Sequence, residues 1–154
     1  DHFRSVITCE PDPTNWLCLS KNLAARDSLK RVTAIHAAFG EREGGCTPLV
    51  VEPHNCGAHR VEFDKGTIPV WTIDGLELSR CDAIWLDCEG SELFALRGAV
   101  ETIERFAPVI CVEDKGLDAA FFGVAPGSLQ QFLAERGYAE ADRIGRDKIF
   151  KRIT

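Results

Sequence analysis

The sequence predicts an α/β fold with a mainly parallel sheet. Short apolar runs alternate along the chain with segments whose apolar residues recur at helical spacing. The clearest predicted strands are residues 83–87 and 108–113, and residues 91–104 between them carry one apolar stripe. Parallel neighbours need a crossover connection, so we expect these runs to be adjacent parallel strands joined by one helix.

The N-terminal part begins with a β-prone run over residues 5–9. The turn residues Glu10-Pro11-Asp12-Pro13 stop this strand. A helix is predicted from Thr14 onward, with Thr14 or Asp12 as its N-cap. Residues 31–40 then read as another strand that runs into a loop.

Residues 48–52 and 59–63 are predicted to form a hairpin around Asn55-Cys56-Gly57. Two cysteines and two histidines of this region could in principle bind zinc, but the spacing H-x-C-x-x-H matches no standard finger. We therefore favour an ordinary polar hairpin and predict no metal ligand. The four residues concerned are Cys46, His54, Cys56 and His59.

The C-terminal part has four further features. Asp74 is expected to be a cap or turn residue before the central strand. Residues 114–123 read as a loop that is apolar enough to fold over a site as a lid. Leu and Phe at positions 129–133 mark a helix, and residues 138–142 and 148–153 read as a terminal antiparallel pair.

Length and composition fit one globular domain over residues 1–154. With 24 acids and 18 bases the net charge is −6, and no basic block is present, so nucleic acid is not expected as a partner. No apolar run approaches the roughly 18 residues of a membrane span, so no membrane contact is expected. Seven cysteines without a C-x-x-C pair favour a cytoplasmic location.

The segment at 81–100 holds the best candidates for chemistry. Ala83-Ile84-Trp85-Leu86 is an unalternating run, as in a strand buried on both faces, and Asp87-Cys88-Glu89-Gly90 follows it. Ligands of open α/β sheets bind at the carboxyl edge of the strands. Helix-start chemistry, in which carboxylates accept orphan N–H groups, is an equally good interpretation of Asp87 and Glu89 from spacing alone. Glu92 lies in the first turn of the predicted helix, where a negative charge suits the dipole.

The longer string D-C-E-G-S-E-L-F-A-L-R-G-A, followed by a helix and A-P-V-I-C-V-E, resembles the signature of the FkbM-type methyltransferases. Glu10-Pro11, Asn15 and Asn22 also resemble that family's pattern. The resemblance implies a Rossmann-like methyltransferase fold, with helices on both faces of the sheet and an antiparallel last strand. It implies S-adenosylmethionine as cofactor and O-methylation of a hydroxyl on a sugar or another natural-product-type small molecule.

The resemblance also implies cofactor-binding residues. Glu10 ends the strand whose terminal acid hydrogen-bonds the ribose hydroxyls in the wider Rossmann pattern. Ala38 and Phe39 belong to the segment that passes the adenine ring in the family. Asp87 and Glu89, from the central turn, are the remaining predicted cofactor contacts.

Asp87 and Glu113 are the predicted catalytic residues. They end two runs that the usual sheet order makes neighbours, so both should face one cleft, and a hydroxyl acceptor benefits from a general base. Two alternatives stay open. One is a non-catalytic binding or assembly module that keeps the fold, and the other is a metal-dependent enzyme with Asp87 and Glu89 as ligands.

The sequence departs from the family pattern at its start. Family members carry a glycine-rich loop of the D-x-G-A-N-x-G kind before the Glu-Pro strand, and nothing upstream of Glu10 supplies one. Because the chain also begins at Asp1 and contains no methionine, we expect it to be N-terminally incomplete, without the first strand and helix. The chain alone should then bind S-adenosylmethionine weakly or not at all, and a homo-oligomer is expected to cover the exposed sheet edges.

Overall fold

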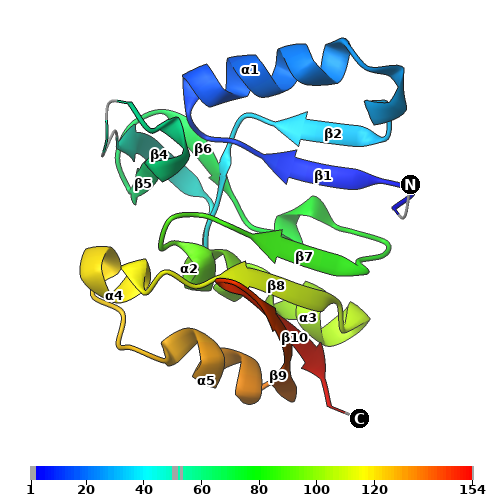
Figure 1. Ribbon diagram of the computed structural model, residues 1–154, viewed down its shortest axis with the longest axis vertical. Helices are drawn as coiled ribbons and strands as arrows, with labels where there is room; N and C mark the ends of the chain where they lie inside the picture. Colours follow the sequence, from blue (N-terminus) through cyan, green and yellow to red (C-terminus); the bar gives the residue numbers. More distant parts are fainter. Residues whose placement is uncertain (1–2, 50–51, 53, 154) are drawn as a thin grey trace. The chain divides into compact units, whose positions relative to one another are not determined.

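The computed structural model describes residues 3–49, 52 and 54–153, which belong to two compact units. One unit comprises residues 1–39 and 43–71, and the other comprises residues 40–42 and 72–154. Helices and strands alternate along the chain, which confirms the α/β class (Figure 1). The expectation of a single domain stays a prediction.

The first unit opens with a β–α–β arrangement. Strand β1 (Val6–Cys9) pairs in parallel with β2 (Val32–Ile35), and helix α1 (Pro13–Ala24) and a short 3₁₀ turn (Asp27–Leu29) connect them. Asp12 is the N-cap of α1, since its Oδ1 accepts the backbone N–H groups of Thr14 at 2.8 Å and Asn15 at 3.0 Å. The predicted strand, turn and cap are confirmed here.

The same unit holds a four-stranded sheet in the order β3 (Ala38–Phe39), β6 (Ile68–Trp71), β4 (Gly44–Leu49), β5 (Arg60–Phe63). The strand predicted within 31–40 is confirmed as β2, but the loop expected after it contains the short strand β3. A tight turn, in which the N–H of Ala37 donates to the carbonyl of Ile35 at 3.0 Å, redirects the chain into this other sheet.

The predicted hairpin is confirmed as the antiparallel pair β4–β5, which starts earlier than expected and includes a 3₁₀ turn (Cys56–Ala58). Residues 50 and 51 of its first predicted strand lie outside the described residues. The hydrophobic core of this four-stranded sheet comprises Ala38, Cys46, Val61 and Val70, against which Phe63 and Ile68 pack.

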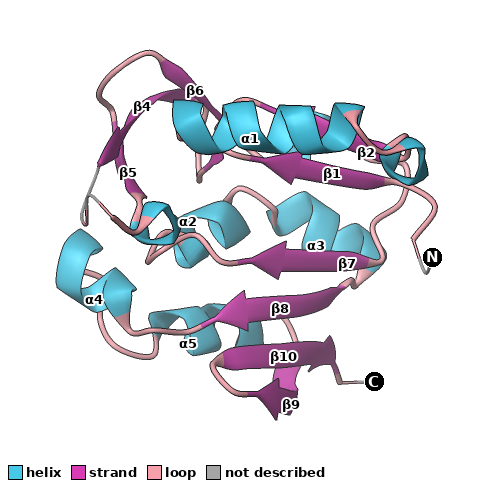
Figure 2. Ribbon diagram, turned by 45° about the horizontal axis from the view of Figure 1, so that its top comes forward, coloured by secondary structure: helices cyan, strands magenta, loops and turns pink. Residues whose placement is uncertain are grey.

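In the second unit the strands β7 (Ala83–Leu86), β8 (Val109–Glu113), β10 (Asp147–Arg152) and β9 (Tyr138–Ile144) lie side by side in that order (Figure 2). Strands β7 and β8 are parallel neighbours, as predicted. Strand β10 runs antiparallel to both β8 and β9, which confirms the terminal antiparallel pair. The chain thus contains mixed sheets, with parallel pairs β1–β2, β3–β6 and β7–β8 and antiparallel pairs elsewhere.

The crossover between β7 and β8 is two helices, α2 (Glu92–Arg97) and α3 (Val100–Phe106), rather than the single helix predicted over 91–104. The helical segment is interrupted at Gly98. A Cβ atom on residue 98 would lie only 2.1 Å from the carbonyl oxygen of Gly40. The second helix has its own cap, because the two oxygens of Asp74 accept the N–H groups of Glu101 and Thr102 at 3.0 and 2.8 Å. The capping role predicted for Asp74 is confirmed, after a short 3₁₀ turn (Asp74–Leu76).

Two local expectations for this unit are wrong. Strand β7 is not buried on both faces, because its burial alternates and Trp85 is 71% exposed. The predicted loop at 114–123 contains a short helix, α4 (Leu117–Phe122). The following helix α5 (Ser128–Ala134) is confirmed and packs against β9.

None of the helices among the described residues is long and apolar enough to cross a membrane. The seven cysteines, all within the described part of the chain, form no disulfide.

Candidate active site

One lysine holds three carboxylates at the carboxyl ends of β7 and β8. The Nζ atom of Lys115 lies 2.6 Å from Oε1 of Glu89 and 2.9 Å from Oε2 of Glu113. It lies 3.4 Å from Oδ1 of Asp87. Because the two strands are parallel neighbours, their carboxyl ends meet at one edge, so the structure brings the predicted pair Asp87 and Glu113 together.

The carboxyl groups of Asp87 and Glu113 come within hydrogen-bond reach, so that a proton on Asp87 can be donated to Glu113. Partial burial of Asp87, reinforced by this hydrogen bond and by the charge of Glu113, raises the pKa of Asp87 to about 6, although the charge of Lys115 opposes the rise. The same hydrogen bond, together with that from Lys115, lowers the pKa of Glu113. The pair thus favours a proton on Asp87 and a negative charge on Glu113.

Lys115 keeps its charge in this cluster. Partial burial by itself lowers the pKa of its ammonium, but the hydrogen bonds to Glu89 and Glu113 outweigh that effect, so the pKa is raised overall. Lys115 was not among the site residues predicted from the sequence. Its place in the sequence could have indicated a site residue. Lys115 comes two residues after Glu113, the last residue of β8, so its side chain lies on the same side of the chain as that of Glu113.

A second residue that the sequence analysis did not place in the site, Glu92, shapes the central turn. Its side chain is buried, and its Oε1 accepts the backbone N–H groups of Cys88 at 2.8 Å and Gly90 at 3.2 Å. Glu92 therefore takes the role of satisfying N–H groups at the helix start, which leaves Asp87 and Glu89 to face Lys115. Burial raises the pKa of Glu92, and these backbone hydrogen bonds oppose the rise.

The turn itself has an unusual backbone. Glu89 adopts a φ of 51°, in the left-handed region that non-glycine residues seldom occupy. Gly90 follows with a φ of 105°, and a Cβ there would lie 3.0 Å from the carbonyl carbon of Leu117. Glycine at this position thus lets the start of α4 rest directly on the turn.

In the first unit, Glu10 follows the end of β1. Its Oε1 accepts the N–H of Asp12 at 2.8 Å, and no described residue donates a hydrogen bond to its other oxygen. The side chain is partly buried, and this burial raises its pKa. A partly buried carboxylate with one unengaged oxygen fits the hydroxyl groups of a ribose, so Glu10 suits the cofactor that the sequence resemblance implies.

The residues around Glu10 include two histidines that the sequence analysis gave no functional role. Nδ1 of His59 lies 2.9 Å from Oδ2 of Asp12, and both side chains are largely buried. The ring of His36 stacks on Trp16 with centroids 5.1 Å apart, and its Nε2 is buried without a partner among the described residues.

The two predicted adenine contacts differ in accessibility. Ala38 is only 5% exposed and its methyl group packs in the core of the first unit, whereas Phe39 is partly buried. A role of either residue in cofactor binding stays a prediction, as do the cofactor contacts of Asp87 and Glu89.

The sequence profile of the Methyltransferase FkbM domain matches residues 4–139. The chain belongs to this family. Its fold is similar to the crystal structure of Methyltransferase FkbM from Methylobacillus flagellatus KT, with a TM-score of 0.61 and 21% sequence identity. That likeness, which concerns the fold alone, covers 96% of this chain and 36% of the other, so the chain spans about a third of that protein's length. A search of the curated proteins found no match.

Metal ligation receives no support in this FkbM domain. Within residues 3–49, 52 and 54–153, no group of three or more His, Cys, Asp or Glu residues is placed to hold a metal ion. Cys46 lies in the core, Cys56 is exposed, and His59 pairs with Asp12. The space that a cation would take between Asp87 and Glu89 is filled by the ammonium group of Lys115.

Proposed function

We propose that this FkbM domain is an S-adenosylmethionine-dependent methyltransferase that methylates a hydroxyl group of a small molecule, such as a sugar or another natural product. Family membership supports a methyltransferase. The observation that carries the finer proposal is that the carboxyl groups of Asp87 and Glu113 meet beside Lys115 at the shared edge of β7 and β8. A general base of this kind is what a hydroxyl acceptor benefits from.

S-adenosylmethionine, when bound, supplies a methyl group that is already electrophilic, so the protein mainly has to align the acceptor oxygen. Glu10 would accept hydrogen bonds from the ribose hydroxyls through its unengaged oxygen. Phe39, with Ala38 beside it, would line the adenine. In the second unit, Glu89 is held in place by Lys115 and is a further proposed cofactor contact.

Asp87 is the proposed base. Its ionised form accepts the proton of the acceptor hydroxyl, and its protonated form then donates a hydrogen bond to Glu113. The pKa of about 6 leaves Asp87 mostly ionised at neutral pH and still basic enough to take a proton. Lys115 keeps Glu113 ionised, so that Glu113 remains an acceptor for the proton on Asp87.

The test is Asp87→Asn, with transfer of labelled methyl groups to a panel of sugars and hydroxylated natural products as readout. Loss of a general base should lower turnover by about 100-fold or more, with cofactor affinity by calorimetry changed little. The matched control is Asp82→Asn. Asp82 is an exposed aspartate that directly precedes the first residue of β7 and pairs with Arg80.

Three outcomes would count against the proposal. If Asp87→Asn lost only cofactor affinity, Asp87 would belong to the cofactor contacts and would not be the base. If Asp82→Asn lost as much activity as Asp87→Asn, the effect would not be specific to the carboxylate cluster. Cofactor binding without transfer to any acceptor would instead favour a binding module.

A further inference from the structure

Asp12 connects the proposed ribose contact Glu10 to a distant segment of the first unit. Asp12 is buried, and its backbone N–H donates to Oε1 of Glu10 at 2.8 Å. Its Oδ1 caps α1, while its Oδ2 lies 2.9 Å from Nδ1 of His59. Among the residues that the structure describes, His59 is the sole partner of this Oδ2, and it lies 47 positions further along the chain, directly before β5. One residue thus contacts both Glu10 and His59.

The contact between Asp12 and His59 joins a carboxylate to a ring N–H group. Burial by itself raises the pKa of Asp12, but the hydrogen bonds from Asn15, His59 and Thr14 outweigh that effect, so the pKa is lowered overall. An ionised carboxylate oxygen can only accept, so Nδ1 of His59 carries the hydrogen and donates it. Both side chains are largely buried, so water is a poor substitute for either partner.

The orientation of Glu10 depends on this contact. Glutamate has a long, flexible side chain, and ordering such a side chain at the moment of binding lowers the affinity for the ligand. The N–H of Asp12 already holds one oxygen of Glu10. Without His59, Oδ2 of Asp12 would be a buried acceptor without a donor, and the turn would have to move to bring it to water. That movement would take the N–H of Asp12 away from Glu10.

We propose that His59 is a positioning residue, which acts through Asp12 to hold Glu10 in the orientation that accepts the ribose hydroxyls of the cofactor. His59 itself is assigned no contact with the cofactor. This inference rests on the proposed function, because the ribose contact of Glu10 belongs to that function.

A second bond between the same two segments provides the matched control. Nδ2 of Asn15 donates to the carbonyl oxygen of Cys56 at 3.1 Å, so it also connects α1 to the chain before β5. This bond does not involve the side chain of Asp12. If His59 did no more than hold these two segments together, Asn15→Ala should therefore have the same effects as His59→Leu.

The experiment uses the amide proton of Asp12 as a reporter of its bond to Glu10, in the ¹⁵N-labelled chain without ligand. Burial raises the pKa of Glu10, whereas the pKa of Asp12 is lowered, so the two carboxyl groups titrate in separate pH ranges. An amide proton that donates to a carboxylate shifts when that carboxylate takes up a proton. The amide signal of Asp12 should therefore shift with the same midpoint that carboxyl ¹³C NMR gives for Glu10.

This shift should shrink at least about twofold in His59→Leu, because the bond between Asp12 and Glu10 is no longer held in place. It should persist in Asn15→Ala. It should also persist in His59→Asn, whose side-chain amide can donate from the place of Nδ1. If His59→Leu does not fold, His59→Phe, which keeps an aromatic ring without a donor, takes its place. An undiminished shift in His59→Leu, equal losses in His59→Leu and Asn15→Ala, or a loss in His59→Asn would each overturn the inference.

Adenosine separates this inference from the proposed function, because it carries the ribose and lacks the methionine portion of the cofactor. Its affinity, measured by NMR titration, should fall about fivefold in His59→Leu, since Glu10 must then be ordered on binding. The affinity of 2′,3′-dideoxyadenosine, which lacks both ribose hydroxyls, should stay the same.

Two outcomes distinguish the two proposals. If the Asp12 shift behaves as expected but the unchanged chain binds adenosine no better than dideoxyadenosine, the support of Glu10 by His59 stands and the ribose contact of Glu10 fails. If adenosine binds through its hydroxyls and His59→Leu changes neither its affinity nor the Asp12 shift, the ribose contact stands and the positioning role is wrong.

Discussion

The carboxyl groups of Asp87 and Glu113 meet beside Lys115 at the edge where their two parallel strands end. Two carboxylates so close do not titrate independently, because ionising one disfavours ionising the other. Lys115 contacts both, and its charge lowers the pKa of each. The titration of Asp87 is therefore the most direct probe of this arrangement.

The pKa of Asp87 should fall from about 6 in Glu113→Gln, because both the charge and the hydrogen bond of Glu113 raise it. It should rise in Lys115→Met, because the ammonium charge lowers it. Carboxyl ¹³C NMR titration of Asp87 measures both shifts. An Asp87 pKa that stayed the same in both variants would mean that burial alone sets it.

In a longer chain that also carries the family's glycine-rich loop, Glu10→Ala should weaken S-adenosylmethionine binding by about 1.5–3 kcal/mol, the usual worth of a hydrogen bond to a charged group. The physical reason is the unengaged oxygen of Glu10, which the variant removes. Isothermal calorimetry gives the affinity. Glu43→Ala serves as the control, since Glu43 is an exposed glutamate of the same unit. Equal affinities of the Glu10 and Glu43 variants would rule out the ribose assignment.

Gly98→Ala should destabilise the chain by about 1–3 kcal/mol, the usual cost of overpacking. The added methyl group would lie 2.1 Å from the carbonyl oxygen of Gly40, so the backbone has to move. Gly44→Ala is the matched control, because nothing lies within 4 Å of a Cβ there. Urea denaturation compares the free energies of unfolding of the two variants. A Gly98 variant as stable as the Gly44 variant would show that the close approach of Gly40 to Gly98 does not constrain the break between α2 and α3.

Neighbouring residues of β7 should differ sharply in their effect on stability. Leu86→Ala should cost about 2–5 kcal/mol, since Leu86 is only 3% exposed. Trp85→Thr should stay within about 0.5 kcal/mol of the unchanged chain, since Trp85 is 71% exposed. Similar large losses in both variants would mean that the outer face of β7 is covered in solution.

The part of the fold that could be predicted follows from local patterns. Two apolar runs flanking one amphipathic stretch were enough to predict that β7 and β8 are parallel neighbours, and this placed Asp87 and Glu113 at one edge. The N-cap role of Asp12 was likewise foreseeable from the turn residues around it. Such features depend on residues close together in sequence or on the general geometry of parallel strands.

The missed features depend on contacts between distant residues. The break in the crossover helix comes from the approach of Gly40 to Gly98, which helical periodicity cannot reveal. Likewise, the sequence near Lys115 is that of an ordinary surface lysine. Only the fold brings three carboxylates from two segments of the chain around it. The apolar run of β7 was misread because composition does not tell whether the second face of a strand is covered, and Trp85 lies on the open face.

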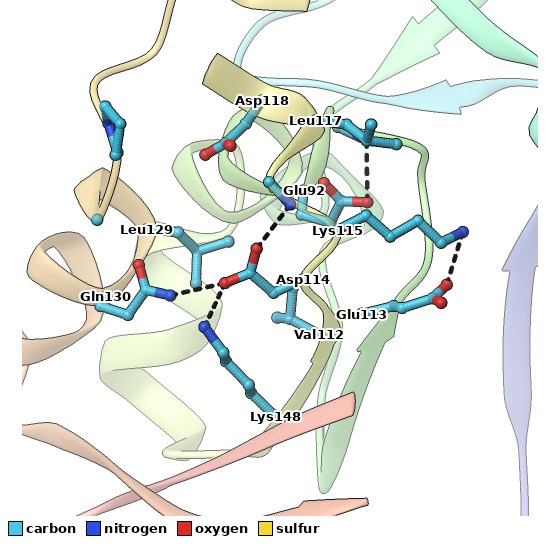
Figure 3. Close-up of a pocket in the computed structure, with 14 residues that line it drawn as sticks. Glu92, Val112, Glu113, Asp114, Lys115, Leu117, Asp118, Leu129, Gln130 and Lys148 are labelled. Carbon is cyan, nitrogen blue, oxygen red and sulfur yellow. Dashed lines mark hydrogen bonds and ion pairs between the residues drawn. The ribbon is translucent and has the colours of Figure 1, made fainter. Parts of the chain in front are cut away.

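The carboxylate cluster around Lys115 and the cavity beyond β8 (Figure 3) are built from different stretches of the chain. The side chains of the cluster all lie between residues 87 and 115, whereas the far walls of the cavity, whose volume is about 430 Å³, come from α4, α5 and β10, after residue 116. Replacements at Asp118, Gln130 or Lys148 can therefore reshape the cavity while the side chains around Lys115 stay untouched. The two features of this domain can thus change independently of each other.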